Sequence, residues 1–323
     1  MAAPLELSIC DDDAEWDALV RASAQGTVFS QSGFLRSLGC SFKRYVVRSQ
    51  NKPLALCAAP EDAGGTKLTG FAFTPYLGIL FLHDAASPVR QRVLDEFRLS
   101  EFFIEALTAR YRDIAMALSW HFGDLRPFLW HHYHEAEAPH FTTIPRYTAL
   151  LDLATVDAET FPARVRACRR QELRKAAPYA IREESEVDTF LRLYELTFAR
   201  QDIALAPETL ALVRSITCAA LEQGYGRLSS CSTPDGVASM NLFLYDQRRA
   251  YYLFAASDPA FRNTGAATRL MFDNIYHAKQ RGTAEFDFVG ANSPNRGDFK
   301  LSFGAELKLY FELRYAGAAR AET

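Results

Sequence analysis

Residues Ala250 to Gly290 have the residue types of an anion-binding turn. A run typical of a strand, Ala250 to Ala256, leads into a loop and then a long helical pattern that starts at Gly265. The first amides of a helix lack partners and the helix dipole is positive there, so this position suits a phosphate. An ordinary turn, in which Gly265 only relieves strain, is the alternative. The expected phosphate-binding residues are Arg262, Asn263, Thr264, Gly265, Ala266 and Ala267.

Acidic and phenolic residues nearby suit proton transfer. Asp287 lies at the end of an expected strand, Ala284 to Val289, between two phenylalanines, so its carboxylate points away from the face that the rings bury. It can take a proton or hold an acceptor amine, or it can simply anchor the next loop. Tyr252 can protonate a leaving group, although strand aromatics are more often core. The weaker candidates for the base are Glu195, which can also bind the acceptor, and Asp298.

A basic run lies earlier in the same half. Arg166, Arg170 and Arg174 recur at intervals of four and therefore share one face of an expected helix. This face suits a phosphate-bearing ligand, and a solvated face with Glu172 as partner is the alternative.

Other classes of site are disfavoured. The histidine-rich loop at residues 131–140 has no carboxylate or cysteine at a matching spacing, so we expect no metal. No G-x-S-x-G sequence is present, which argues against a serine hydrolase. The net charge of −3 disfavours general attraction to nucleic acid.

Composition predicts a cytoplasmic protein. The six cysteines are scattered without a C-x-x-C pair, which indicates reduced thiols. The first residues do not form a signal peptide, and no apolar stretch is long enough for a transmembrane helix.

The order of elements predicts two related α+β domains. Each half of the 323 residues shows helices, a β-meander, and then a helix followed by a strand. We place the domains at residues 1–153 and 154–323, each a mixed sheet flanked by helices. The first half has no glycine loop before its long helix at 88–109, which makes a nucleotide site less expected there. The basic run predicts one helix over 161–177, and residues 71–82 are apolar and β-rich.

Several short stretches resemble one family. The loop R-x-x-G-x-A at 262–267 is similar to the pyrophosphate loop of GNAT acyltransferases, and residues 120–310 resemble its Fem-type branch, the FemAB-like acyl and aminoacyl transferases. The stretches that carry this resemblance are DLRPFLW (124–130), YTALLDL (147–153), RACRRQELRKA (166–176), LYELTFARQ (193–201), FDFVG (286–290) and FKLSFG (299–304).

The resemblance implies two tandem GNAT-like domains, with the acyl donor held by the second. It also implies that Lys300, in the F-K-x-x-F-G stretch, lies near the reacting carbonyl, where a cation stabilises an oxyanion. Fem-type enzymes take an amino acid from aminoacyl-tRNA, whereas the GNAT-like relatives use acyl-CoA. The absence of a coiled-coil insertion, together with the loop at 262–267, favours acyl-CoA.

We therefore expect an acyl-CoA-dependent N-acyltransferase that works by direct attack on the thioester. The acceptor is expected to be an amine or hydroxyl, such as an amino sugar or another cell-envelope precursor. One alternative is an aminoacyl-tRNA-dependent transferase, which would bind tRNA through Arg166, Arg170 and Arg174. The other is a binding protein that kept the fold without catalysis.

Overall fold

The chain forms two compact units in a computed structural model, which describes residues 4–70, 72–83 and 86–317. Unit 1 consists of Met1–Arg146 together with Leu309–Thr323, and unit 2 is Tyr147–Lys308. The expected division was 1–153 and 154–323. The structure differs from it because the last strand returns to unit 1, so unit 1 is built from both ends of the chain.

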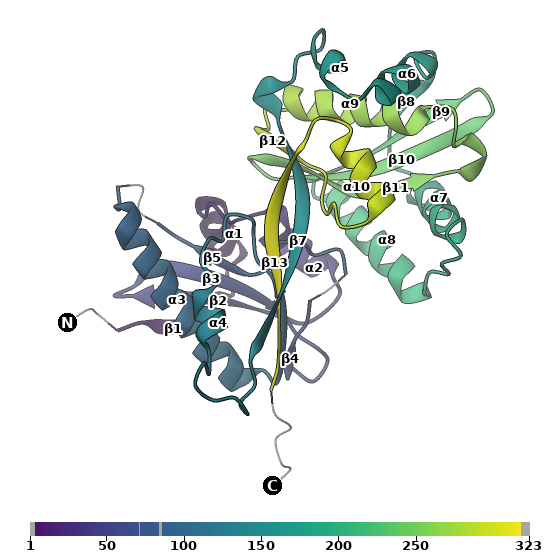
Figure 1. Ribbon diagram of the computed structural model, residues 1–323. Helices are drawn as coiled ribbons and strands as arrows, with labels where there is room; N and C mark the ends of the chain where they lie inside the picture. Colours follow the sequence, from purple (N-terminus) through teal and green to yellow (C-terminus); the bar gives the residue numbers. More distant parts are fainter. Residues whose placement is uncertain (1–3, 71, 84–85, 318–323) are drawn as a thin grey trace. The chain divides into compact units, whose positions relative to one another are not determined.

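Unit 2 contains a mixed sheet in the order β7-β12-β11-β10-β9-β8. β11 and β12 are parallel, and the other pairings reported for this sheet are antiparallel. Figure 1 shows α9 on one face of this sheet and α7 and α8 on the other. The strands are β7 (Phe141–Asp152), β8 (Ala180–Glu184), β9 (Gly226–Thr233), β10 (Gly236–Tyr245), β11 (Arg249–Ser257) and β12 (Glu285–Asp287).

Helix α9 (Ala266–Gln280) is held to the sheet by its apolar side. Leu270, Met271, Ile275 and Ala278 are buried, and their spacing of three or four residues puts them on one stripe. Met271, Ile275 and Ala278 belong to a core that also contains Phe243 and Phe286, and Leu270 packs in a smaller cluster with Cys231 and Ala238. The other helices of unit 2 are α5 (Phe161–Arg164), α6 (Ala167–Lys175), α7 (Val187–Ala199), α8 (Pro207–Glu222) and α10 (Pro294–Leu301).

Unit 1 has its own core and two sets of strands. One sheet has the order β1-β2-β3-β5, and in the other set β6 pairs with both β4 and β13. The strands are β1 (Glu6–Ile9), β2 (Phe42–Ser49), β3 (Lys52–Pro60), β4 (Lys67–Leu68), β5 (Ile79–Phe81), β6 (Asp113–Ala117) and β13 (Glu306–Ala316). The helices are α1 (Asp13–Ala22), α2 (Ser32–Ser37), α3 (Val89–Arg110) and α4 (Arg126–Trp130).

The structure corrects two expected elements. The helix expected over 161–177 is broken, because Val165 and Arg166 are extended, with ψ of 162° and 146°, and separate α5 from α6. Within the β-rich run 71–82, only Ile79–Phe81 is a strand. Phe73 and Tyr76 have φ of 66° and 60°, which is incompatible with a continuous strand; Phe71 lies outside the described residues.

No helix in the described part of the chain is long and apolar enough to cross a membrane.

Candidate functional site

Strands β11 and β12 pair over only a short length. Arg249, Ala250 and Tyr251 pair with β12, which ends at Asp287. β11 continues to Ser257 with β10 as its strand neighbour, and Ser257 at its end exchanges hydrogen bonds with the Thr197 hydroxyl of α7. The sheet therefore opens after Tyr251, and an interior edge of β11 has no paired strand in the described structure. Such an edge can hold an extended ligand by main-chain hydrogen bonds.

The turn after β12 is held by buried polar contacts. The Asp287 carboxylate is 0% exposed and accepts hydrogen bonds from Thr148 Oγ1 at 2.5 Å and from the Val289 amide at 2.8 Å. The Thr148 hydroxyl also accepts a hydrogen bond from the Gly290 amide at 3.3 Å. Val289 and Gly290 have φ of 49° and 66°, and a branched residue in this region is strained. Of the two roles that the sequence allowed for Asp287, base or anchor of the next loop, these contacts fit the anchor.

Lys300 lies directly against this turn. Its Nζ donates to the carbonyl oxygens of Val289 and Gly290, the second at 2.7 Å. Burial lowers the pKa of Lys300 to about 8, and the nearby Asp287 carboxylate opposes this shift. An ammonium has three N–H groups, so two carbonyl partners leave a third for a ligand.

Tyr252 joins Lys300 and Asp287 in one cluster. The Lys300 ammonium lies 5.7 Å from the centre of the Tyr252 ring, and that ring stacks on Phe243 with 5.2 Å between centroids. Tyr252 is 8% exposed, and burial raises the pKa of its phenol. The structure therefore brings together the three residues expected to be catalytic, and Tyr252 also belongs to the core.

The expected phosphate loop forms the start of α9. Gly265 is the residue before the helix, with φ of 83°, and the Ala266 amide donates to Thr264 Oγ1 at 3.3 Å. Among the described residues, no group accepts a hydrogen bond from the amides of Ala267 and Thr268. Arg262 and Asn263 are exposed. The loop thus has free amides and an exposed arginine, as an anion site requires.

Gly265 is needed for a reason that the sequence did not reveal. A Cβ at this position would lie 2.5 Å from the carbonyl oxygen of Glu172 in α6. The missing side chain therefore makes room for another helix. The space beside Gly265 is filled by protein backbone, so the missing side chain does not leave room for a ligand there.

The three arginines of the basic run do not form one open face. Arg166 pairs with Asp298 at 2.6 Å, and Arg170 donates to the Val165 carbonyl oxygen at 2.5 Å. Arg174 is exposed and has no hydrogen bond or ion pair among the described residues. The break before α6 causes this arrangement, since it removes Arg166 from the helix. Glu195, on α7, is exposed, and no contact joins it to the Lys300 cluster.

Two residues of the cluster escaped sequence reasoning. Thr148 lies in the YTALLDL stretch, where a polar residue between apolar strand residues was a usable signal. Arg296 precedes Lys300 by one helical turn, lies 5.4 Å from the centre of the Phe198 ring and lowers the pKa of Lys300. The spacing of four residues on α10 was the only hint of it, and that helix was not expected.

No group of three or more metal-binding side chains occurs among the residues that the structure describes. In the histidine-rich loop, burial lowers the pKa of His131 to about 4, and His140 contacts the carbonyl oxygens of His131 and Glu135.

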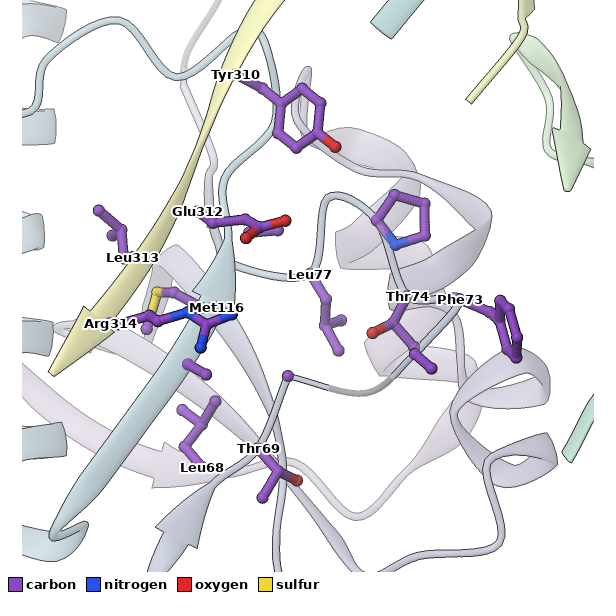
Figure 2. Close-up of a pocket in the computed structure, with 15 residues that line it drawn as sticks. Leu68, Thr69, Phe73, Thr74, Leu77, Met116, Tyr310, Glu312, Leu313 and Arg314 are labelled. Atoms are coloured by element: carbon purple, nitrogen blue, oxygen red, sulfur yellow. The ribbon is translucent and has the colours of Figure 1, made fainter. Parts of the chain in front are cut away.

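Unit 1 contains a separate pocket of about 430 Å³. Figure 2 shows residues of the loop before β5, such as Thr74 and Leu77, facing Met116 of β6 and Glu312 of β13. Glu312 pairs with Arg146 at 3.0 Å. No residue expected from the sequence to act in catalysis or donor binding lines this pocket.

Part of the chain matches a known protein family. A family model described as an acetyltransferase (GNAT) domain matches residues 161–301, which include the α9 turn, Asp287 and Lys300. No curated protein matches the chain.

Solved structures match nearly the whole chain. FemX has a TM-score of 0.67 at 12% identity, with 95% of this chain and 96% of FemX covered. A tandem GNAT protein from the clavulanic acid biosynthesis pathway has a TM-score of 0.59 at 13% identity, covering 99% and 100%. L-PGS from Bacillus licheniformis has a TM-score of 0.55 at 13% identity, covering 95% and 93%. At such identities the likeness shows the fold.

The expected fold of two tandem GNAT-like domains and the resemblance to Fem-type GNAT-fold proteins are therefore confirmed, and residues 161–301 match the model of a GNAT acetyltransferase domain.

Proposed function

We propose that unit 2 transfers an acyl group from acyl-CoA to an amine or hydroxyl. The observation that carries this proposal is the placement, within one GNAT domain, of an open β11 edge, a helix start with free amides and a lysine held on two backbone carbonyls. The amides of Ala267 and Thr268, with Arg262, hold the pyrophosphate of the donor. The backbone of β11 after Tyr251 holds its extended arm.

Lys300 stabilises the charge that develops on the thioester oxygen. The acceptor attacks the carbonyl carbon directly, the carbon–sulfur bond breaks, and CoA leaves as a thiolate. The third N–H of Lys300 faces the oxyanion while the other two stay on the Val289 and Gly290 carbonyls. A pKa of about 8 leaves most of the lysine charged at pH 7.

The proton leaves the acceptor without a strong base. We assign Asp287 to holding the turn and to balancing the charge of Lys300. Its carboxylate is fully buried and accepts hydrogen bonds from Thr148 and Val289. Tyr252 stays the proposed proton donor to the CoA thiolate, since its raised pKa keeps it protonated. The acceptor amine then arrives neutral, and the proton that it loses after attack passes through water to the Tyr252 phenolate, which restores the phenol.

The acceptor class rests on likeness to other proteins. FemX, L-PGS and the tandem GNAT protein share the fold of this chain. An amino sugar or another cell-envelope precursor fits an enzyme of this type. A cytoplasmic location is part of the proposal, and it is supported by the six cysteines, which are all free.

The test is thermal stability of the full chain titrated with CoA and acetyl-CoA. Ligand at about 100 times its Kd stabilises a protein by about 2.7 kcal/mol, which is roughly 5–10 °C for a domain of this size. The test variant is Ala267→Asp. A carboxylate in the first turn of α9 favours the helix but repels the pyrophosphate, so the shift is lost while the fold is kept.

Thr209→Asp is the matched control, because it puts the same charge in the first turn of α8 in the same unit. We expect this variant to keep the CoA-induced increase in melting temperature. The proposal would be overturned if wild type showed no shift at millimolar CoA, or if both variants kept it.

An aminoacyl-tRNA donor is the second candidate, favoured by the fold shared with FemX. The engagement of Arg166 and Arg170 in contacts within the protein counts against a broad RNA surface. Binding of aminoacyl-tRNA that weakens steeply with salt, in the absence of any CoA-induced shift, would favour this candidate instead.

A further inference from the structure

Helix α6 lies on the start of α9 without a core of its own. None of its nine residues is buried. A helix this short and polar has little intrinsic stability, so its contacts with neighbours decide where it stays. Apart from Leu173, which packs against the core of unit 2, those contacts are polar and concentrated on the elements that form the proposed donor site.

The central contact is made by a carboxylate. Glu172 Oε2 accepts a hydrogen bond from Thr268 Oγ1, in the first turn of α9. Arg169 reaches the same two groups, with Nη1 2.7 Å from Glu172 Oε2 and 3.0 Å from Thr268 Oγ1. Thr268 is 1% exposed, so this triad is covered, while the Glu172 side chain is 35% exposed. A negative group thus already lies where the positive end of the helix dipole attracts one.

The backbone of α6 fixes this carboxylate in place. The Glu172 carbonyl group fills the space that a side chain would take at Gly265. Lys175 donates to the carbonyl oxygen of Asn263, in the loop before the helix. Glu172 is therefore held over the same turn that offers its free amides to a phosphate.

The same helix also contacts the element that carries Lys300. Arg166 pairs with Asp298, and the Arg169 guanidinium lies 5.0 Å from the centre of the Phe299 ring. Both partners belong to α10 and directly precede Lys300.

We propose that Glu172 is a built-in competitor for the donor's pyrophosphate, and that Arg169 and Thr268 become ligands of that pyrophosphate when Glu172 leaves. The incoming phosphate oxygens replace one carboxylate on the same arginine and hydroxyl, and they bring more charge to the helix start. This inference rests on the proposed function, since it concerns the same donor site. It adds two binding residues and a gate that the donor has to open.

The test compares the affinity of full-length variants for CoA and for inorganic pyrophosphate, measured by calorimetry. Glu172→Gln keeps an acceptor for Thr268 and Arg169 but removes the competing charge. We expect CoA to bind about tenfold more tightly, because one charge-assisted contact no longer has to be broken. Arg169→Met is expected to weaken CoA binding about tenfold, because the pyrophosphate loses a charged partner.

The control is Asp188→Asn. Asp188 is also an acid that is paired with an arginine, Arg214, but it lies in the first turn of α7. We expect the Asp188→Asn variant to bind CoA with unchanged affinity. Opposite effects of the Glu172 and Arg169 variants are decisive, because a purely structural α6 would weaken binding in both.

Each outcome separates this inference from the proposed function. If wild type binds CoA and Glu172→Gln binds it equally or less tightly, the gate is refuted while the donor site stands. If neither protein binds CoA or pyrophosphate, the proposed function fails, and the inference fails with it.

Discussion

Both units contain a strand, a long helix and a strand in the same order, but the arrangement of these elements differs. They are β5, α3 and β6 in unit 1 and β11, α9 and β12 in unit 2. In unit 2, Gly265 with φ of 83° starts α9, and β11 and β12 pair for three residues before the sheet opens. In unit 1, α3 follows Pro88, which has φ of −58° and gives no side-chain cap. β5 and β6 belong to different sheets there. The strand edge that β11 offers in unit 2 therefore has no counterpart between β5 and β6.

The difference teaches that the order of elements does not make a donor site. The glycine turn and the short pairing of β11 with β12 are local features of unit 2, and the described residues of unit 1 have neither between β5 and β6. Unit 1 offers instead a pocket beside β6 and β13, lined by residues without a proposed catalytic role. The chemistry should therefore respond to changes in unit 2 at single positions, and three predictions test this.

The largest expected effect is at Lys300. Lys300→Met should lower kcat about 10²–10³-fold with little change in KM for the donor, because the lysine acts on the oxyanion in the transition state. Steady-state kinetics with acetyl-CoA and an amine acceptor measure this.

Lys279→Met is the matched control, since Lys279 also donates to two backbone carbonyls, those of Leu153 and Val156. It lies near the far end of α9 and should leave kcat unchanged. Equal losses in kcat from both variants would mean that Lys300 acts only on stability.

The next effect concerns Gly265. Gly265→Ala should destabilise the protein by about 3 kcal/mol, because left-handed strain of about 1–2 kcal/mol is joined by a clash with the Glu172 backbone. Urea unfolding followed by circular dichroism measures this loss.

Gly282 gives the comparison within the same unit. It has φ of 86°, but a Cβ there would meet nothing within 4 Å. Gly282→Ala should therefore cost only the strain of about 1–2 kcal/mol. Similar costs at the two positions would show that α6 does not pack on Gly265 in solution.

The smallest effect is that of pH. The charged form of Lys300 is the active one, so activity should be constant below its pKa of about 8 and fall about tenfold per pH unit above it. A pH profile of kcat with acetyl-CoA tests this, with an acceptor that is neutral throughout the range. Activity that rises through pH 8 would mean that neutral Lys300 acts as a base.

Local patterns carried much of the fold. The strand at 250–256, Gly265 and the apolar stripe of α9 all lie within about thirty residues, so sequence spacing alone predicted this strand–turn–helix segment. The pairs that make the site are distant in sequence. Thr148 meets Asp287, and Glu172 meets Gly265, only after the sheet and helices have packed. No periodicity shows such contacts.

Helix α10 was missed because its sequence disfavours a helix. Gly297 has poor helix propensity within the helix, and a Cβ there would lie 2.7 Å from the Ala291 carbonyl oxygen, whereas Pro294 suits the first helical position. Tertiary packing therefore decides this helix. Lys300 entered the expected site through family resemblance alone, and its contacts with Val289 and Gly290 came only from the structure.

The return of β13 to unit 1 affects the order in which the protein is made. Residues 113–117 of β6 pair with residues 312–316, so this partner strand is synthesised only after the whole of unit 2. Although unit 1 comes first in the sequence, it is the last to be completed on the ribosome. Until then, β6 exposes an unpaired edge, the kind of surface that recruits other chains. The arrival of β13 therefore both completes unit 1 and covers this edge.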